Sequence, residues 1–442
     1  MQCNYLRRGL FLATIAGALT LAACGGDSGG GGTSSFSAPN TPPPVTSPGS
    51  GLFAVDCNTQ RAYVPLDKFD TATGNGQVAV IDLTADPDTK NPVKTVVVLS
   101  HPDLPTGTAF DNDHKLILVV SGQTSGQDGK LDIIDQATDT LVAGSPFSFP
   151  TGSQAGFFGQ ILYNPTTHLA VAATCNSTDC ENIGDPLEGF VTFDPVAHTF
   201  GSIVQANYPE TFALNAATNT VMDASDDATF NVLSTVDMTG GRTCALTDTN
   251  IGGDQDGAST DATTNLTIIS NEDGSATVLN LHGSTSTGTP CTVNYGGTPP
   301  NSVLLTGLPS STAGSAVDAT RHQAFLIEDG SPGVTLVQLP SAPKTQLNPA
   351  DIPAPAISSI PNTPLGTGWE TQGDPYAVSI DVCKNRGYAI DSAFSFLAQV
   401  DLATLKSNPG VISTALPAGN CAGTASTFSC KNGNGVEFFP LP

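Results

Sequence analysis

Three short segments decide the fold: Thr108-Ala-Phe-Asp111, Lys115-Leu-Ile-Leu-Val-Val-Ser121 and Lys130-Leu-Asp-Ile-Ile-Asp135-Gln-Ala-Thr-Asp-Thr-Leu-Val-Ala143. Short apolar runs rich in β-branched residues and bounded by turn residues are typical of β-strands. The last segment contains two such strands around a four-residue turn that is closed by Asp139. Together the segments predict one antiparallel sheet of four strands.

The same unit recurs along the chain, which is the signature of a repeat architecture. Its first strand ends in a polar marker residue at Asp56, Asp111, Asn164, Asn215, Asp261, Asp318 and Asp381. Its third strand ends at or near Asp82, Asp135, Asp194, Asp237, Asn280, Gln338 and Asp401. Seven four-stranded units of about 50 residues each predict an all-β fold over residues 51–442, a seven-bladed β-propeller of four-stranded antiparallel blades.

The apolar pattern agrees with stacked blades. Strands buried on both faces read as continuous apolar runs, such as residues 116–120, rather than as strict alternation. No part of the chain after residue 23 has a sustained 3.6-residue period, so we expect few helices. The seventh blade is expected to be complete by about Leu416, with residues 435–442 as an extra strand on the first-blade side of the ring. The Pro-rich loop 341–374, which contains Trp369, departs from the repeat.

The unit also resembles the YVTN family of bacterial propellers, whose blades read strand, turn, strand and then an "IDTATN"-like turn. Gln136-Ala-Thr-Asp139 after Ile134-Asp135 carries the resemblance most closely. It covers about residues 51–416 and is degenerate in the fifth and sixth blades. The resemblance implies the same propeller fold, and some related propellers are hydrolases such as lactonases.

The N-terminus indicates export. Arg7 and Arg8 precede a largely apolar stretch over residues 9–23 that is short for a membrane-spanning helix. Leu21-Ala-Ala-Cys24 resembles a bacterial lipoprotein signal, which implies that residues 1–23 are removed and Cys24 is lipidated. The alternative is an ordinary secretory signal in which Cys24 is incidental. Gly25 implies, by the same resemblance, the outer membrane of a Gram-negative envelope, and the Gly/Ser/Pro-rich residues 24–50 predict a disordered tether.

Ten cysteines agree with an oxidising compartment. Without Cys3 and Cys24, eight remain, which is an even number. We predict a disulfide between the turns of the first and seventh blades, another between fourth strands of adjacent blades, and two that close short loops. These pairs are Cys57–Cys383, Cys244–Cys291, Cys175–Cys180 and Cys421–Cys430.

Charge limits the partners. The chain has 40 acidic and 15 basic side chains, a formal net charge of −25, which argues against nucleic acid. Placed on the blades, many acids fall in the connections of one face, where they would attract cations or basic ligands. The candidate ligand-binding residues near the channel mouth are Asp103, Glu210, Asp254, Asp256 and Asp374. Calcium at Asp254 and Asp256 is the one cofactor considered, against the alternative that the acids only maintain solubility.

Histidines argue against a histidine-centred hydrolase, because only His101 approaches the acidic face, where we expect a lone surface residue. The leading hypothesis is a membrane-anchored, monomeric, non-enzymatic binding module whose partner is a protein or a small molecule. The alternative is a lactonase-like or other hydrolase that uses carboxylates at the channel mouth. A purely structural envelope component is the third hypothesis.

Overall fold

The computed structural model describes the propeller and two residues before it. The described residues are 34–35, 53–85, 90–122, 127–156, 159–177, 184–206, 209, 211–224, 234–246, 251–253, 255–298, 300–308, 312–328, 333–360, 378–390, 396–407, 409 and 435–442.

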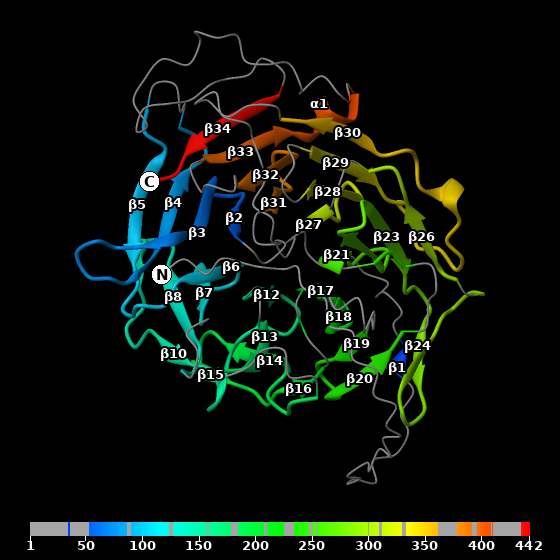
Figure 1. The fold of residues 1–442 in the computed structure, drawn as a ribbon, viewed down its shortest axis with the longest axis horizontal. Helices are drawn as coiled ribbons and strands as arrows, with labels where there is room; N and C mark the ends of the chain where they lie inside the picture. Colours follow the sequence, from blue (N-terminus) through cyan, green and yellow to red (C-terminus); the bar gives the residue numbers. More distant parts are fainter. Residues whose placement is uncertain are drawn as a thin grey trace, which may run out of the picture. The chain divides into compact units, whose positions relative to one another are not determined.

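Seven antiparallel sheets follow one another around a ring, in chain order, as the repeat predicts (Figure 1). Blade 1 contains β2 (Ala54–Asp56), β3 (Arg61–Phe69), β4 (Gly76–Asp82) and β5 (Val93–Val98). Blade 2 contains β6 (Pro105–Asp111), β7 (Leu116–Ser121) and β8 (Lys130–Asp135), with β9 (Thr140–Leu141) and β10 (Phe147–Ser148) outside them. Blade 3 contains β11 (Ser153–Ala155), β12 (Ile161–Asn164), β13 (Leu169–Asn176), β14 (Gly189–Asp194), β15 (Thr199–Phe200) and β16 (Val204–Gln205).

The remaining four blades keep the same order. Blade 4 contains β17 (Thr211–Asn215), β18 (Thr220–Ala224), β19 (Ser234–Asp237) and β20 (Arg242–Ala245). Blade 5 contains β21 (Gln255–Asp261), β22 (Leu266–Asn271), β23 (Ser275–Asn280) and β26 (Ser302–Leu305). Blade 6 contains β27 (Thr312–Asp318), β28 (Gln323–Glu328), β29 (Gly333–Gln338) and β30 (Ala356–Ser359). Blade 7 contains β31 (Val378–Asp381), β32 (Arg386–Ile390), β33 (Phe396–Asp401) and β34 (Val436–Pro440).

Helices are few, as expected. In the described part of the chain they are α1 (Leu402–Ser407) and the 3-10 turn η1 (Pro349–Asp351). No described helix has both the length and the apolar character needed to cross a membrane.

Every first strand ends at its predicted marker residue, and a turn of four residues follows each of them. In all seven turns the marker's Oδ1 accepts the N–H of the residue two positions later, at 2.8–3.0 Å. The fourth turn residue is left-handed, with φ between 52° and 60°. An Asp or Asn side chain that caps its own turn explains why this position recurs along the sequence.

Side chains of these turns also connect neighbouring blades. The markers Asn164, Asn215, Asp261 and Asp381 each bond the fourth turn residue of the next blade around the ring. The remaining interfaces use Gln136 with Asp56, His168 with Asp113, and Arg321 with the Val382 carbonyl. A polar contact therefore crosses all seven interfaces on this side, each adding about 0.5–1.5 kcal/mol net.

The core lies between blades. On β8, Ile133 packs in a cluster shared with blade 3, whereas the next residue, Ile134, packs in a cluster shared with blade 1. Five clusters each join two neighbouring blades, and a larger one joins blades 6, 7 and 1. Because consecutive side chains point to opposite faces, burial of both faces requires the continuous apolar runs seen in the sequence.

Three expectations about the last blades are wrong. The C-terminal strand β34 is not an extra strand beside blade 1: it pairs with β33 and completes blade 7, burying Phe438 and Phe439. The segment 341–374 does not depart entirely from the repeat, because it contains β30, the outer strand of blade 6. Trp369 lies outside the described residues.

The third correction concerns Cys291. It precedes β25 (Thr292–Asn294), which with β24 (Thr285–Thr287) forms a hairpin between the third and fourth strands of blade 5. This hairpin adds to the edge of blade 4, because β25 pairs with β20, and β24 also pairs with β1 (Ser34–Ser35). Cys291 is therefore in an inserted hairpin rather than in a fourth strand.

The two predicted long-range disulfides are present. Cys57 bonds Cys383, with Cα atoms 5.6 Å apart, and Cys244 bonds Cys291, with Cα atoms 4.5 Å apart. Cys175 is also disulfide-bonded. Its predicted partner Cys180 lies outside the described residues, as do both cysteines of the predicted Cys421–Cys430 pair.

Candidate functional site

The two sides of the ring differ in their connections near the axis. We call the side with the seven four-residue turns the turn face: 57–60, 112–115, 165–168, 216–219, 262–265, 319–322 and 382–385. We call the other side the loop face. There the connections from second to third strands range from three residues (272–274) to twelve (177–188). The turn face also has longer connections, which join third to fourth strands. These lie at the outside of the blades, away from the axis.

The predicted ligand residues on the loop face are placed only in part. Asp103 lies between β5 and β6, at the entry to blade 2, and Asp256 lies on β21 in blade 5. These blades are not neighbours, so the two carboxylates are not brought together. Glu210, Asp254 and Asp374 lie outside the described residues.

Several acids that we expected in exposed connections are buried instead. Asp223 and Glu328 belong to second strands, and Asp256 to a first strand, where neighbouring strands cover them. Asp103 is also buried, as are Asp132 and Glu188, which the sequence analysis did not single out. Buried carboxyl groups are rare unless they are partnered or functional. The acids of the loop face are therefore divided between its interior and its surface.

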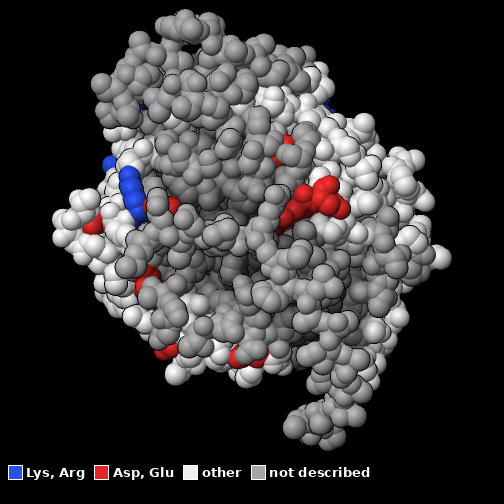
Figure 2. Space-filling view, in the orientation of Figure 1, with Lys and Arg blue, Asp and Glu red and all other residues white. Residues whose placement is uncertain are grey.

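The exposed acids of the loop face are correspondingly fewer. Asp67 and Asp273 are exposed, while Asp70, Asp185 and Glu272 are partly exposed. Figure 2 shows acidic side chains at separate places on the described surface rather than in one continuous patch. The predicted acidic character persists there, but as dispersed charge.

His101 is not the lone surface histidine that we expected. Its ring is buried between two carboxylates, with Nε2 2.6 Å from Asp132 Oδ2 and Nδ1 3.2 Å from Asp103 Oδ2. The Asp103 backbone N–H also donates to Nδ1, at 3.3 Å. Because His101 follows blade 1 and Asp132 belongs to β8, this cluster is a polar bridge between blades 1 and 2.

The signal for this bridge was present in the sequence. Asp132 stands in the otherwise apolar run Leu-Asp-Ile-Ile of β8, with its side chain on the same face as Ile134. A carboxylate at a core position of a strand requires a buried partner. Sequence alone did not identify His101 as that partner, because the two residues lie in different blades.

Asp223 is a buried acid whose pKa is strongly perturbed. It is 1% exposed, and the Ser234 hydroxyl donates to its Oδ2 across the β18–β19 pair at 3.1 Å. Its other oxygen, Oδ1, has no hydrogen-bond partner. Burial disfavours the charged carboxylate and raises the pKa of Asp223 well above its ordinary value.

A metal centre finds little support among the described residues. One group has its ligand atoms within 4.8 Å of one another: Cys57, Asp381 and Cys383. The two sulfurs of this group are bonded to each other, so they offer no thiolate to a metal ion. Asp256 is not part of such a group, and Asp254 lies outside the described residues. The described residues therefore provide no set of ligands for the predicted calcium ion.

Comparisons with known proteins support the fold but indicate no family and no specific function. No known sequence family matches the chain, and no curated protein is similar to it in sequence. It is similar in structure to a functionally unknown protein from Desulfotomaculum acetoxidans DSM 771, with a TM-score of 0.51 and 10% identity. That likeness covers 81% of this chain and 93% of the other.

Proposed function

We propose that this protein is an exported, lipid-anchored β-propeller that binds a protein or small-molecule partner through its loop face. The observation that carries the proposal is the contrast between the two faces near the axis. The turn face has seven turns of equal length, and polar contacts on this face cross every blade interface. Connections of varied length on a rigid scaffold are where binding residues concentrate, and near the axis those lie on the loop face.

The described residues favour binding over hydrolysis. A carboxylate-based hydrolase needs two acids that cooperate in a site open to substrate and water. On the loop face, two carboxylates of the described residues meet a histidine at the His101 cluster, and His101 is only 7% exposed. We therefore assign that cluster to the blade interface rather than to chemistry.

The proposed location at the cell envelope rests on the sequence. A lipid on Cys24 would hold the protein at the envelope. The resemblance of the repeat to the YVTN propellers of bacteria agrees with that location. The surface acids would favour a partner with positive charge. A Cys24→Ala variant should lose its membrane fraction, and one that still sediments with membranes would refute the anchor.

The binding proposal is tested by introducing an arginine on each face. Asp273→Arg places a bulky cation on the loop face, and Val196→Arg places the same group on an exposed turn-face position. We expect a pull-down from the native envelope to lose its partner with the first variant and to retain it with the second. Loss with Val196→Arg alone would refute the assignment of the binding face.

A further inference from the structure

The ring is closed without any exchange of strands. All strands of blade 1 come from residues 54–98, and all strands of blade 7 come from residues 378–440. Figure 1 shows the two blades side by side, with blue strands next to orange and red ones. At the six other interfaces the chain itself runs from one blade to the next, whereas no described segment runs from blade 7 to blade 1.

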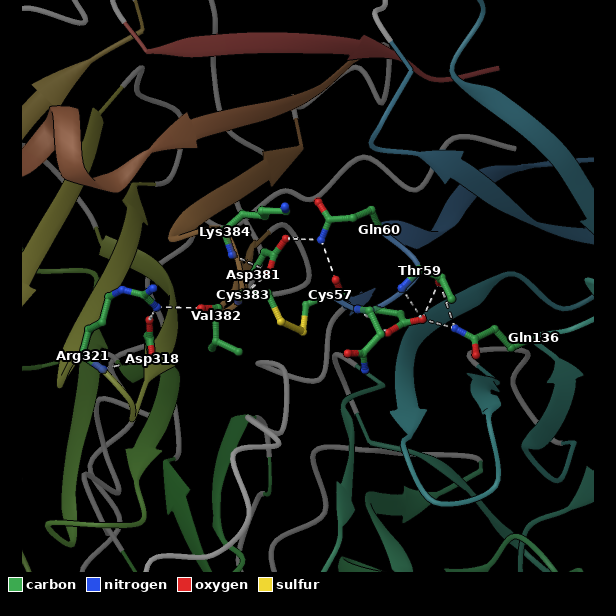
Figure 3. The surroundings of a disulfide bond; sticks show 12 residues. Cys57, Thr59, Gln60, Gln136, Asp318, Arg321, Asp381, Val382, Cys383 and Lys384 are labelled. Atoms are coloured by element: carbon green, nitrogen blue, oxygen red, sulfur yellow. Dashed lines mark hydrogen bonds and ion pairs between the residues drawn. A yellow bond between two sulfur atoms is a disulfide. The ribbon is translucent and has the colours of Figure 1, made fainter.

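The Cys57–Cys383 disulfide supplies the missing covalent connection. It joins the turn after β2 to the turn after β31, two strands that lie against each other, across 326 residues of sequence. Figure 3 shows it beside Gln60 and Asp381. Gln60 Nε2 donates to Asp381 Oδ2 at 2.9 Å and to the Cys57 carbonyl at 2.7 Å. One polar contact and one disulfide therefore close this edge of the seam.

Of the two described disulfides, this one joins the more exposed cysteine residues. Cys383 is exposed and Cys57 is half-buried, whereas in the other described pair Cys291 is half-buried and Cys244 is 1% exposed. Disulfide exchange proceeds by attack of a thiolate on one sulfur, so access to that sulfur controls which bond reacts first. The seam disulfide is thus the more reactive of the two.

We propose that the seam disulfide is a redox latch: a dithiol reductant opens it, and the contact between blades 1 and 7 then loosens. The reductant is a small dithiol or a protein dithiol of the thioredoxin class. Its thiolate attacks Cys383 Sγ, the bond between the two cysteines breaks, and Cys57 leaves as a thiolate that takes up a proton. The second thiol of the reagent then displaces Cys383, so the reagent is oxidised to a disulfide and the pair is reduced to two thiols.

The blades themselves survive this reaction. The apolar cluster that joins blades 6, 7 and 1 includes Phe53, Tyr388 and Phe438, all buried, and it does not depend on the sulfurs. Reduction consequently loosens the turn-face edge of one interface, while the strands of each blade stay paired. The latch is therefore a local switch rather than a condition for folding.

The test combines native reduction with two local readouts on the full chain. The protein is titrated with dithiothreitol, free thiols are trapped with iodoacetamide, and the labelled peptides are identified by mass. We expect Cys57 and Cys383 to be labelled about tenfold faster than Cys244 and Cys291. Amide hydrogen exchange in β2 and β31 should rise about tenfold once the seam bond is reduced, with β17 and β18 unchanged.

Two variants separate the latch from general destabilisation. The Cys57→Ser/Cys383→Ser variant should show fast exchange in β2 and β31 with or without reductant. The matched Cys244→Ser/Cys291→Ser variant keeps the latch and should still respond to dithiothreitol at the seam. Faster labelling of Cys244 and Cys291, or unchanged exchange in β2 and β31 after the seam cysteines are reduced, would overturn the proposal, even if the first variant does not fold.

Discussion

The Asp223→Asn variant should become more stable relative to the wild type as pH rises. In the folded state the carboxyl group is 1% exposed and its pKa is raised well above the ordinary value. In the unfolded chain the pKa is about 3.9. Below that value the group is protonated in both states, so folding is not penalised. Above it only the unfolded state ionises, which draws the wild-type protein towards unfolding.

The size of the effect follows from proton linkage. Between the unfolded and the folded pKa of Asp223, the free energy of unfolding of the wild type falls by about 1.4 kcal/mol per pH unit relative to a neutral side chain. An asparagine does not ionise, so the variant's advantage grows with that slope and becomes constant above the folded pKa. A hydrogen bond lost or gained by the amide shifts the difference by a constant and leaves the slope intact.

Urea unfolding monitored by far-UV circular dichroism between pH 4 and pH 8 measures this difference. The matched control is Asp70→Asn, because hydrogen bonds from Thr73 lower the pKa of Asp70. Its carboxylate stabilises the fold above the unfolded pKa, and that contribution is lost only as pH falls through the lower folded pKa, so the stability that this variant loses should stay nearly constant above about pH 5. A difference between Asp223→Asn and the wild type that does not change with pH would refute the reasoning.

Three further perturbations probe the blade interfaces. Replacing His101 by alanine leaves the buried Asp132 without its partner and should lower the free energy of unfolding by about 3 kcal/mol in urea, while an unchanged value would exclude the bridge. Phe439→Ala should cost about 3–5 kcal/mol by the same assay, and a loss under about 1 kcal/mol would contradict the place of β34 in blade 7. The Cys244–Cys291 bond spans 47 residues and the seam bond spans 326. On the entropic model, removing the seam bond should therefore lower the free energy of unfolding by about 1.7 kcal/mol more than removing Cys244–Cys291 does, and a larger loss from the shorter bond would contradict this model.

The repeat was predictable because each blade encodes it locally. A marker such as Asp111 caps its own turn two residues later, and this requirement is the same in every blade. The Cys57–Cys383 pair was predictable for the same reason, since equivalent turns of the first and last blades must meet when a ring closes. Local rules and chain order were sufficient for the ring and its covalent closure.

Features that depend on contacts between distant segments were not predictable. The position of β34 depends on its pairing with β33, and 34 residues separate the two strands. The burial of Asp223 and Glu328 depends on neighbouring strands that sequence does not reveal. The acids were counted correctly from the sequence, but whether each one faces solvent or the interior depends on this packing.

The central claim is that the loop face binds the partner, and two matched alanines test it most directly. Ala72 on the loop face and Ala197 on the turn face are both exposed, and each donates its backbone N–H to an Asp side chain that caps its turn. A photo-crosslinking amino acid is placed at one or the other in cells, so that the partner is captured in the native envelope. The account predicts a crosslinked partner from position 72 and none from position 197, whereas crosslinks from position 197 alone would contradict it.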